Sequence, residues 1–252
     1  MKQYEYVRQN EYEPVRKKYE QLFHRVQQEL RTDIDFAFVL VGSASRDMIT
    51  REIHGNEGYD FDYDFVVDFE IDYSPKELKE KLMNALDKFG KQYGIKPSED
   101  SKRVITIKLV DHQKSSIIHS CDIAIVRKYR DEDDNICCQF VSAVKKKGRI
   151  RSIWNNRSNG YLGLEGKEKR IRQEEKWEEL EEVYLEKKCH FSDEKPSRSL
   201  YVEAVNEVFS RLSSDSDETI ENYNNGFSGA VLVTNKVKHD NWSTPTLGFW
   251  QN

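Results

Sequence analysis

The first sixty residues change from helical to strand-like spacing of their hydrophobic positions. Apolar residues three or four apart predict an amphipathic helix over 11–31, formed by Val15, Tyr19, Leu22, Val26 and Leu30. The apolar run FAFVLVG at 36–42 ends in glycine and is typical of a buried strand. Ser43 is a suitable N-cap, so the segment SASRDMIT predicts a second helix. The glycines of 51–58 then predict a loop.

Residues 60–72 alternate between large apolar and acidic side chains. The odd-numbered positions are apolar, and the even-numbered positions are acidic apart from Val66: Asp60, Asp62, Asp64, Asp68, Glu70 and Asp72. Because side chains of a strand point to opposite faces in turn, a period of two over about twelve residues predicts one strand. Its apolar face would pack on the core, and its other face would be strongly acidic.

Downstream patterns predict further helices and strands. SPKE at 74–77 is a capping box with proline at the first helical position, and it starts a helix to about 93. RVITIKLVD and SIIHSCDIAIV predict two strands joined as a hairpin by HQKS, and NICCQFV predicts an edge strand. Helical stripes follow at 165–188 and 199–212.

The order of these elements predicts an α+β fold with a mixed β-sheet core and flanking helices, followed by a helical C-terminal region. We expect an α/β domain over 1–147 and a helical domain over 148–212. The polar segment 213–252 allows no structural prediction.

Composition narrows the functional classes. Of the 252 residues, 34% are charged and the net charge is −5, so we expect no long-duplex DNA partner. The chain has neither an apolar run of 18 residues nor a signal-peptide pattern, so we expect a cytoplasmic protein without a membrane partner. The four cysteines form no C-x-x-C pair, which argues for reduced thiols.

The acidic face of the predicted strand indicates a cation-binding site. Carboxylates at Asp62 and Asp64 would sit about 7 Å apart on one face, where they repel by roughly 2 kcal/mol at an effective dielectric constant of about 20. Mg²⁺ prefers such hard oxygen ligands together with substrate phosphates. An EF-hand is excluded, because counting from Asp60 places Phe65 and Ile71 where that loop needs glycine and glutamate.

Two other segments supply complementary chemistry. Gly42 and Ser43 lie between the buried strand and the predicted helix, where free backbone N–H groups and the helix dipole would favour a phosphate. Asp122 stands alone among apolar residues in SCDIAIV. A carboxylate in such a strand needs a partner.

In this order, FVLVGSASR, DYDFVV and SCDIAIV resemble the motifs of the nucleotidyltransferase superfamily of the DNA polymerase β type. The resemblance covers about residues 35–127. The gap between Ser43 and Asp62 is longer than in compact members, which implies an insertion around 53–58. The acidic run also offers Asp60 with Asp62 as a second register. We prefer Asp62 with Asp64, because an apolar triplet follows them as in the family.

This resemblance implies metal-dependent nucleotidyl transfer from a nucleoside triphosphate (NTP), with Mg²⁺ or Mn²⁺ as cofactor. It implies that Asp62, Asp64 and Asp122 are catalytic and bind the metal ions, and that Asp122 assists deprotonation of the acceptor. It also implies that Gly42 and Ser43 bind the β- and γ-phosphates, with support from Arg46.

The sequence leaves the acceptor open among a small molecule, a nucleotide, an RNA end and a protein. A non-catalytic nucleotide-binding or interaction module on the same fold is the main alternative, and an unrelated acidic α/β binding protein is another. The basic segment KKKGRIR at 145–151 is either a solvated turn or a contact for a polyanion.

Overall fold

The structure is a computed structural model, and it describes residues 2–56, 58–111, 113, 116–132, 136–146, 149–156 and 163–215. The chain divides into two compact units, and the larger one runs from Gln3 to Ser158. The other unit contains the C-terminal helices. The described part of the chain has no helix long and apolar enough to cross a bilayer.

A mixed sheet forms the centre of the larger unit. Its principal strands are β2 (Phe36–Val41), β4 (Tyr59–Val67), β7 (Ser116–Arg130), β6 (Ile105–Asp111) and β5 (Glu99–Asp100), hydrogen-bonded in that order. The β4–β7 pair is parallel, whereas the other pairs are antiparallel. The sheet continues through β8 (Ile136–Lys146) on β7 and β9 (Arg149–Asn156) on β8. A small separate sheet pairs β1 (Tyr4–Tyr6) with β3 (Thr50–Glu52).

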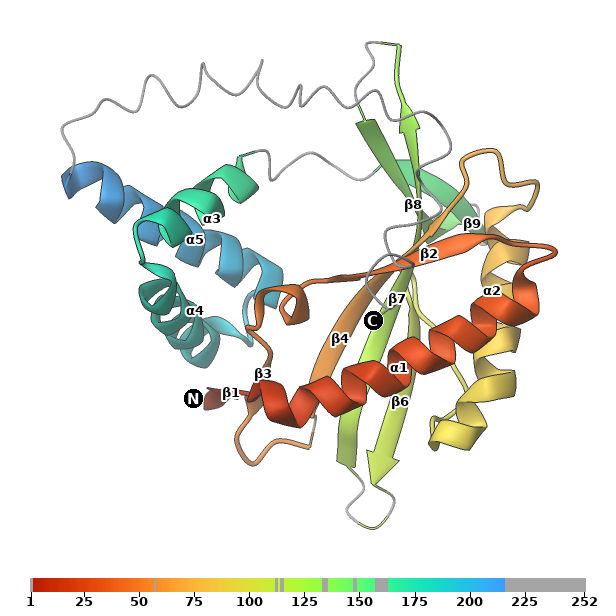
Figure 1. Cartoon of the computed structure of the whole chain (residues 1–252), viewed down its shortest axis with the longest axis horizontal. Coiled ribbons are helices and arrows are strands. Elements are labelled where there is room, and N and C mark those ends of the chain that lie inside the picture. The colour runs from red at the N-terminus through yellow and green to blue at the C-terminus, as the bar shows by residue number, and fades with distance from the viewer. Residues whose placement is uncertain are drawn as a thin grey trace, which may run out of the picture. The chain divides into compact units, whose positions relative to one another are not determined.

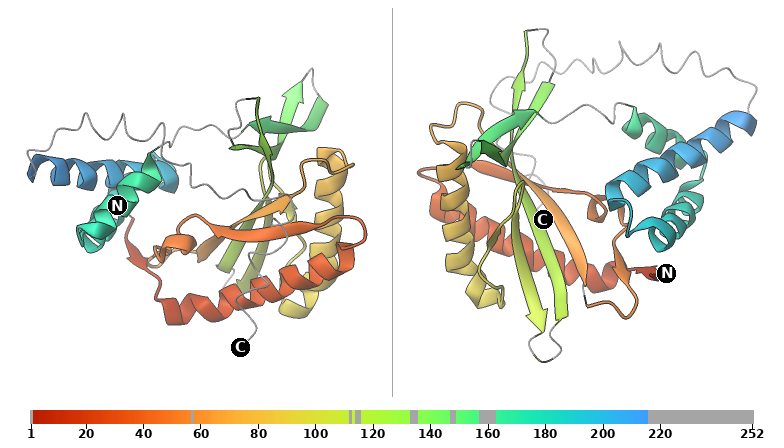
Figure 2. Two further views of the ribbon diagram at one scale, coloured as in Figure 1. Left: turned by 45° about the horizontal axis from the view of Figure 1, so that its top comes forward. Right: turned by 180° about the vertical axis from the view of Figure 1, so that it is seen from behind.

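Two helices, α1 (Gln9–Leu30) and α2 (Pro75–Gly90), pack on one face of this sheet (Figures 1 and 2). The odd-numbered side chains of β4 point to that face, where Phe61, Tyr63 and Phe65 are at most 1% exposed. Phe23 of α1 meets Tyr63 and Phe65 edge to face at centroid distances of 5.0 and 4.9 Å. The predicted division of the strand into an apolar and an acidic face therefore corresponds to the packing of β4.

The predicted capping box begins α2. The Ser74 side chain accepts a hydrogen bond from the Glu77 amide, and the Glu77 carboxylate accepts one from the Ser74 amide. The helix ends at Gly90 instead of about residue 93, because a short 3₁₀ turn follows and Gly94 takes a left-handed φ of 74°. These structures confirm the predicted α+β class with a mixed sheet and flanking helices.

The sequence-based prediction differs from the structure at two places near the site. SASRDMIT forms only a three-residue 3₁₀ turn, Ala44–Arg46, and the chain then enters β3. Burial of Met48 and Ile49, each 1% exposed, draws the segment into the core instead of along a helix. The acidic strand ends at Val67, because Asp68 forms a turn in which its carboxylate accepts a hydrogen bond from the Glu70 amide at 3.0 Å.

The end of the sheet also differs from the expectation. Residues 149–156 were expected at the start of the helical region, but they form β9, paired with β8 through residues 139–146. The expected domain boundary at 147 thus falls between two paired strands.

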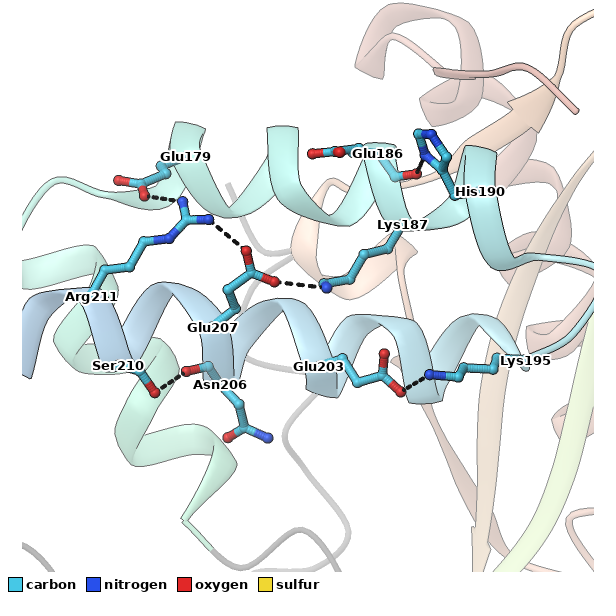
Figure 3. A network of polar contacts seen from close by, with 10 residues as sticks. All are labelled: Glu179, Glu186, Lys187, His190, Lys195, Glu203, Asn206, Glu207, Ser210 and Arg211. Atoms are coloured by element: carbon cyan, nitrogen blue, oxygen red, sulfur yellow. Dashed lines mark hydrogen bonds and ion pairs between the residues drawn. The ribbon is translucent and has the colours of Figure 1, made fainter. Parts of the chain in front are cut away.

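The C-terminal unit contains α3 (Leu164–Gln173), α4 (Trp177–Phe191) and α5 (Ser197–Asp215). The helix predicted over 165–188 is interrupted before Trp177, where Glu175 has a φ of 56°. Ion pairs connect α4 with α5 (Figure 3): Glu207 contacts both Lys187 at 2.7 Å and Arg211 at 2.5 Å, and Arg211 also contacts Glu179. Most of the segment 213–252 lies outside the described residues.

Candidate active site

Gly42, at the end of β2, lies against the carboxylate of Asp62. Val41 pairs directly with Asp62 across the β2–β4 ladder, and Gly42 then takes a left-handed φ of 70°. A Cβ atom at Gly42 would lie 3.0 Å from Asp62 Cγ and closer still to Oδ2. Glycine is therefore needed here for two reasons: its backbone conformation disfavours other residues, and the space of a side chain is filled by Asp62.

Asp62 and Asp122 are direct partners on adjacent strands. The parallel register of β4 and β7 aligns the two residues, and both side chains point away from the face covered by α1 and α2. Backbones of neighbouring strands lie about 4.8 Å apart, so the fold brings together two carboxylates that are 60 positions apart in the sequence. Asp64 lies on the same face, aligned with Ala124, and its side chain is buried.

Asp122 has a second aligned neighbour, on the other side of β7. Thr106 of β6 is its antiparallel partner and donates its hydroxyl to Asp122 Oδ1 at 2.6 Å. Burial raises the pKa of Asp122, the hydrogen bond from Thr106 opposes this shift, and the charge of Asp60 adds to it. Sequence reasoning did not select Thr106. The available signal is that a polar residue stands between the buried Ile105 and Ile107.

Asp60 is distinct from the other strand aspartates. It is exposed, pairs with Ser120 in the parallel register, and accepts a hydrogen bond from the Ser120 hydroxyl. Asp60 therefore lies one alternation before the Asp62–Asp122 pair on the same face. This position suits the outer edge of the site better than its centre.

The predicted phosphate-binding residues lie in the turn after β2. Arg46 Nη1 donates to the Gly42 carbonyl oxygen at 2.7 Å, and Ser45 Oγ donates to the same oxygen at 2.8 Å. The Ser43 carbonyl accepts the Arg46 amide at 3.1 Å. The guanidinium of Arg46 is thus held beside the Gly42–Asp62 contact. Because the turn replaces the predicted helix, the dipole of a full helix does not contribute to anion binding here.

The side chains on this face are of the type that binds hard divalent cations. Carboxylate oxygens are the ligands that Mg²⁺ and Mn²⁺ favour, and the packing of Asp62 into the space at Gly42 holds one carboxylate in place. Within the described ranges, no group of three or more histidine, cysteine or acidic side chains is close enough together to hold a metal ion.

Comparison with solved structures finds similarity in fold to the CD-NTase CdnG and to DncV cyclic AMP-GMP synthase. Vibrio cholerae DncV cyclic AMP-GMP synthase, in complex with the linear intermediate 5′ pppA(3′,5′)pG, gives a TM-score of 0.48 at 16% identity over 75% of this chain and 51% of that chain. The GTP-bound form of DncV gives 0.47 at 18% identity, over 75% and 49%. Bradyrhizobium diazoefficiens CdnG in complex with GTP gives 0.43 at 16% identity, over 72% and 42%.

The chain thus spans about half the length of these solved proteins. No family model matches the sequence, and no curated protein matches it.

Proposed function

We propose that this chain is a metal-dependent nucleotidyltransferase that moves a nucleoside monophosphate from an NTP to an acceptor and releases pyrophosphate. The observation that supports this most is the direct pairing of Asp62 with Asp122 on the sheet face opposite α1 and α2, beside the glycine turn that ends β2. A solvated acidic surface would not require a glycine whose missing side chain makes room for one carboxylate.

In this proposal Asp62 and Asp64 hold the Mg²⁺ or Mn²⁺ ion that accompanies the triphosphate, and Asp122 completes a second site. Bound divalent ions stabilise charge on the attacking and leaving oxygens in such displacements. Gly42 and Ser43 bind the β- and γ-phosphates through the turn, with Arg46 beside them. Asp122 takes the proton from the acceptor's hydroxyl group. The acceptor's oxygen then bonds to the α-phosphorus, and the bond between the α-phosphorus and pyrophosphate breaks.

The negative charge of the three carboxylates affects the binding of an NTP. A triphosphate placed among three carboxylates is repelled, since like charges about 7 Å apart interact by roughly 2 kcal/mol at an effective dielectric constant of about 20. We therefore expect NTP affinity to depend on the divalent ion.

The test is pyrophosphate release from each of the four NTPs with Mg²⁺ or Mn²⁺, using the wild type and the Asp62→Asn and Asp64→Asn variants. Asp72→Asn is the matched control, because Asp72 is an exposed acid of the same segment that lies beyond the end of β4. We expect both site variants to lose activity and the control to retain it. Ion-dependent NTP binding without release would instead favour the non-catalytic module, and activity retained in both site variants would contradict the site assignment.

A further inference from the structure

Thr106 is placed by the sheet directly beside the third acid of the proposed site. Asp122 occupies the middle of a row of three side chains, with Asp62 aligned on its β4 side and Thr106 aligned on its β6 side. Thr106 is 9% exposed, and its flanking residues Ile105 and Ile107 are buried on the opposite face. The threonine hydroxyl is therefore held close to Asp122 by the strand itself.

The contact between the two side chains is short and uses one carboxylate oxygen. Thr106 Oγ1 donates to Asp122 Oδ1 at 2.6 Å, within the range of hydrogen bonds from a hydroxyl to an ionised carboxylate. An aspartate side chain has two rotatable bonds, and a single hydrogen bond from a rigid neighbour restricts both. Threonine suits this task, because its β-branched side chain has few rotamers in a strand.

We propose that Thr106 is a positioning residue, which holds the Asp122 carboxylate in the orientation that binds a divalent ion. This inference rests on the proposed function, since it takes Asp122 as a metal ligand. Groups that hydrogen-bond to ligating carboxylates orient them, and their removal commonly costs 10- to 100-fold in metal affinity or activity. The predicted role of Thr106 is of this kind, and Thr106 itself contacts neither metal nor nucleotide.

Two substitutions separate this role from simple packing. Thr106→Val keeps the β-branched shape and removes the hydroxyl, whereas Thr106→Ser keeps the hydroxyl and removes a methyl group. Ser120→Ala is a matched control, because it removes the neighbouring hydroxyl on the same face, the one that hydrogen-bonds to Asp60. Thermal unfolding without metal shows whether each variant is folded.

The main readout is the binding of Mn²⁺ alone to the full chain, followed by electron paramagnetic resonance, with kcat and KM for pyrophosphate release as a second readout. We expect Thr106→Val to weaken Mn²⁺ binding and lower kcat about tenfold or more, with little change in the KM for the NTP. Thr106→Ser and Ser120→Ala should stay within about threefold of the wild type.

Three outcomes would overturn the inference. The first is that Thr106→Val binds Mn²⁺ and releases pyrophosphate as the wild type does. The second is that Thr106→Ser loses as much Mn²⁺ affinity and kcat as Thr106→Val, which would show that the hydroxyl is not the group that matters. If the wild type itself shows neither Mn²⁺ binding that depends on Asp62 nor pyrophosphate release, the proposed function fails and this inference fails with it. A wild type that is active while Thr106→Val is unaffected removes only the inference.

Discussion

Replacing Gly42 with alanine tests the geometry of the site without removing any carboxylate. The added methyl group would lie 3.0 Å from Asp62 Cγ and 3.1 Å from Asp62 Cβ, and the residue would have to keep a φ of 70°. A non-glycine residue in the left-handed region costs about 1–2 kcal/mol. Crowding a packed site adds about 1–3 kcal/mol. We therefore expect Gly42→Ala to lower the free energy of unfolding by about 2–5 kcal/mol.

Gly94→Ala is the matched control. Gly94 belongs to the same unit and has a φ of 74°, but a Cβ atom there would meet only the end of the Leu109 side chain, at 3.2 Å. Its expected cost is the backbone term alone, about 1–2 kcal/mol. Urea unfolding followed by circular dichroism measures both variants, and Mn²⁺ binding shows whether Asp62 has been displaced.

A double-mutant cycle isolates the contact itself. In an Asp62→Ala background the methyl group of Gly42→Ala meets less obstruction. The substitution should therefore lower the free energy of unfolding by at least about 1 kcal/mol less in that background than in the wild type. Gly94→Ala should cost the same in both backgrounds. The reasoning is refuted if Gly42→Ala is no more destabilising than Gly94→Ala and binds Mn²⁺ normally, or if its cost is independent of Asp62.

Three further predictions concern other parts of the molecule. Burial lowers the pKa of His119 from 6.5 to about 4, so its protonation favours the unfolded chain. Stability should be fully present above about pH 6.5 and fall as the pH drops toward 4, by at most about 1.4 kcal/mol per pH unit; urea unfolding of His119→Gln should show a flatter pH profile, and an unchanged profile would contradict this origin. Ser74→Ala removes the capping box of α2 and should cost about 1 kcal/mol; an unchanged urea midpoint would show that the cap contributes nothing. Lys187→Met breaks a half-buried ion pair with Glu207 and should cost about 1 kcal/mol or less. That loss should shrink in about 1 M salt, and a loss that does not change with salt would contradict an electrostatic origin.

Local patterns in the sequence predicted the strands that carry the three aspartates of the proposed site, but not the turn after β2. The twofold alternation around Asp62 identifies a strand because one face must be buried, and the Ser74–Glu77 capping box identifies the start of α2. Burial of Met48 and Ile49 in the core overrode the local helical preference after Ser43. None of the side chains at 150–156 is fully buried, and Ile150 is 75% exposed, so no buried face imposes an alternating apolar pattern on β9.

The alignment of Asp62 with Asp122 could not be predicted from the sequence. Asp62 and Asp122 were chosen separately, and only the parallel register of β4 and β7 aligns them. That register depends on the packing of the whole sheet. Thr106 was missed for the same reason, since its partner lies on another strand and its own segment reads as an ordinary alternating strand. The assigned roles of Asp62, Asp64, Asp122, Gly42, Ser43 and Arg46 remain predictions.

The initial rate of pyrophosphate release in Asp62→Asn, compared with that in Asp72→Asn under the same NTP and Mn²⁺ concentrations, tests the central claim most directly. Metal ligation of this kind supplies several kcal/mol of transition-state stabilisation, and each 1.4 kcal/mol corresponds to about tenfold in rate. We predict that Asp72→Asn retains the wild-type rate and that Asp62→Asn loses at least about a hundredfold. Equal rates in the two variants would contradict the claim that this acidic strand face is a nucleotidyl-transfer site.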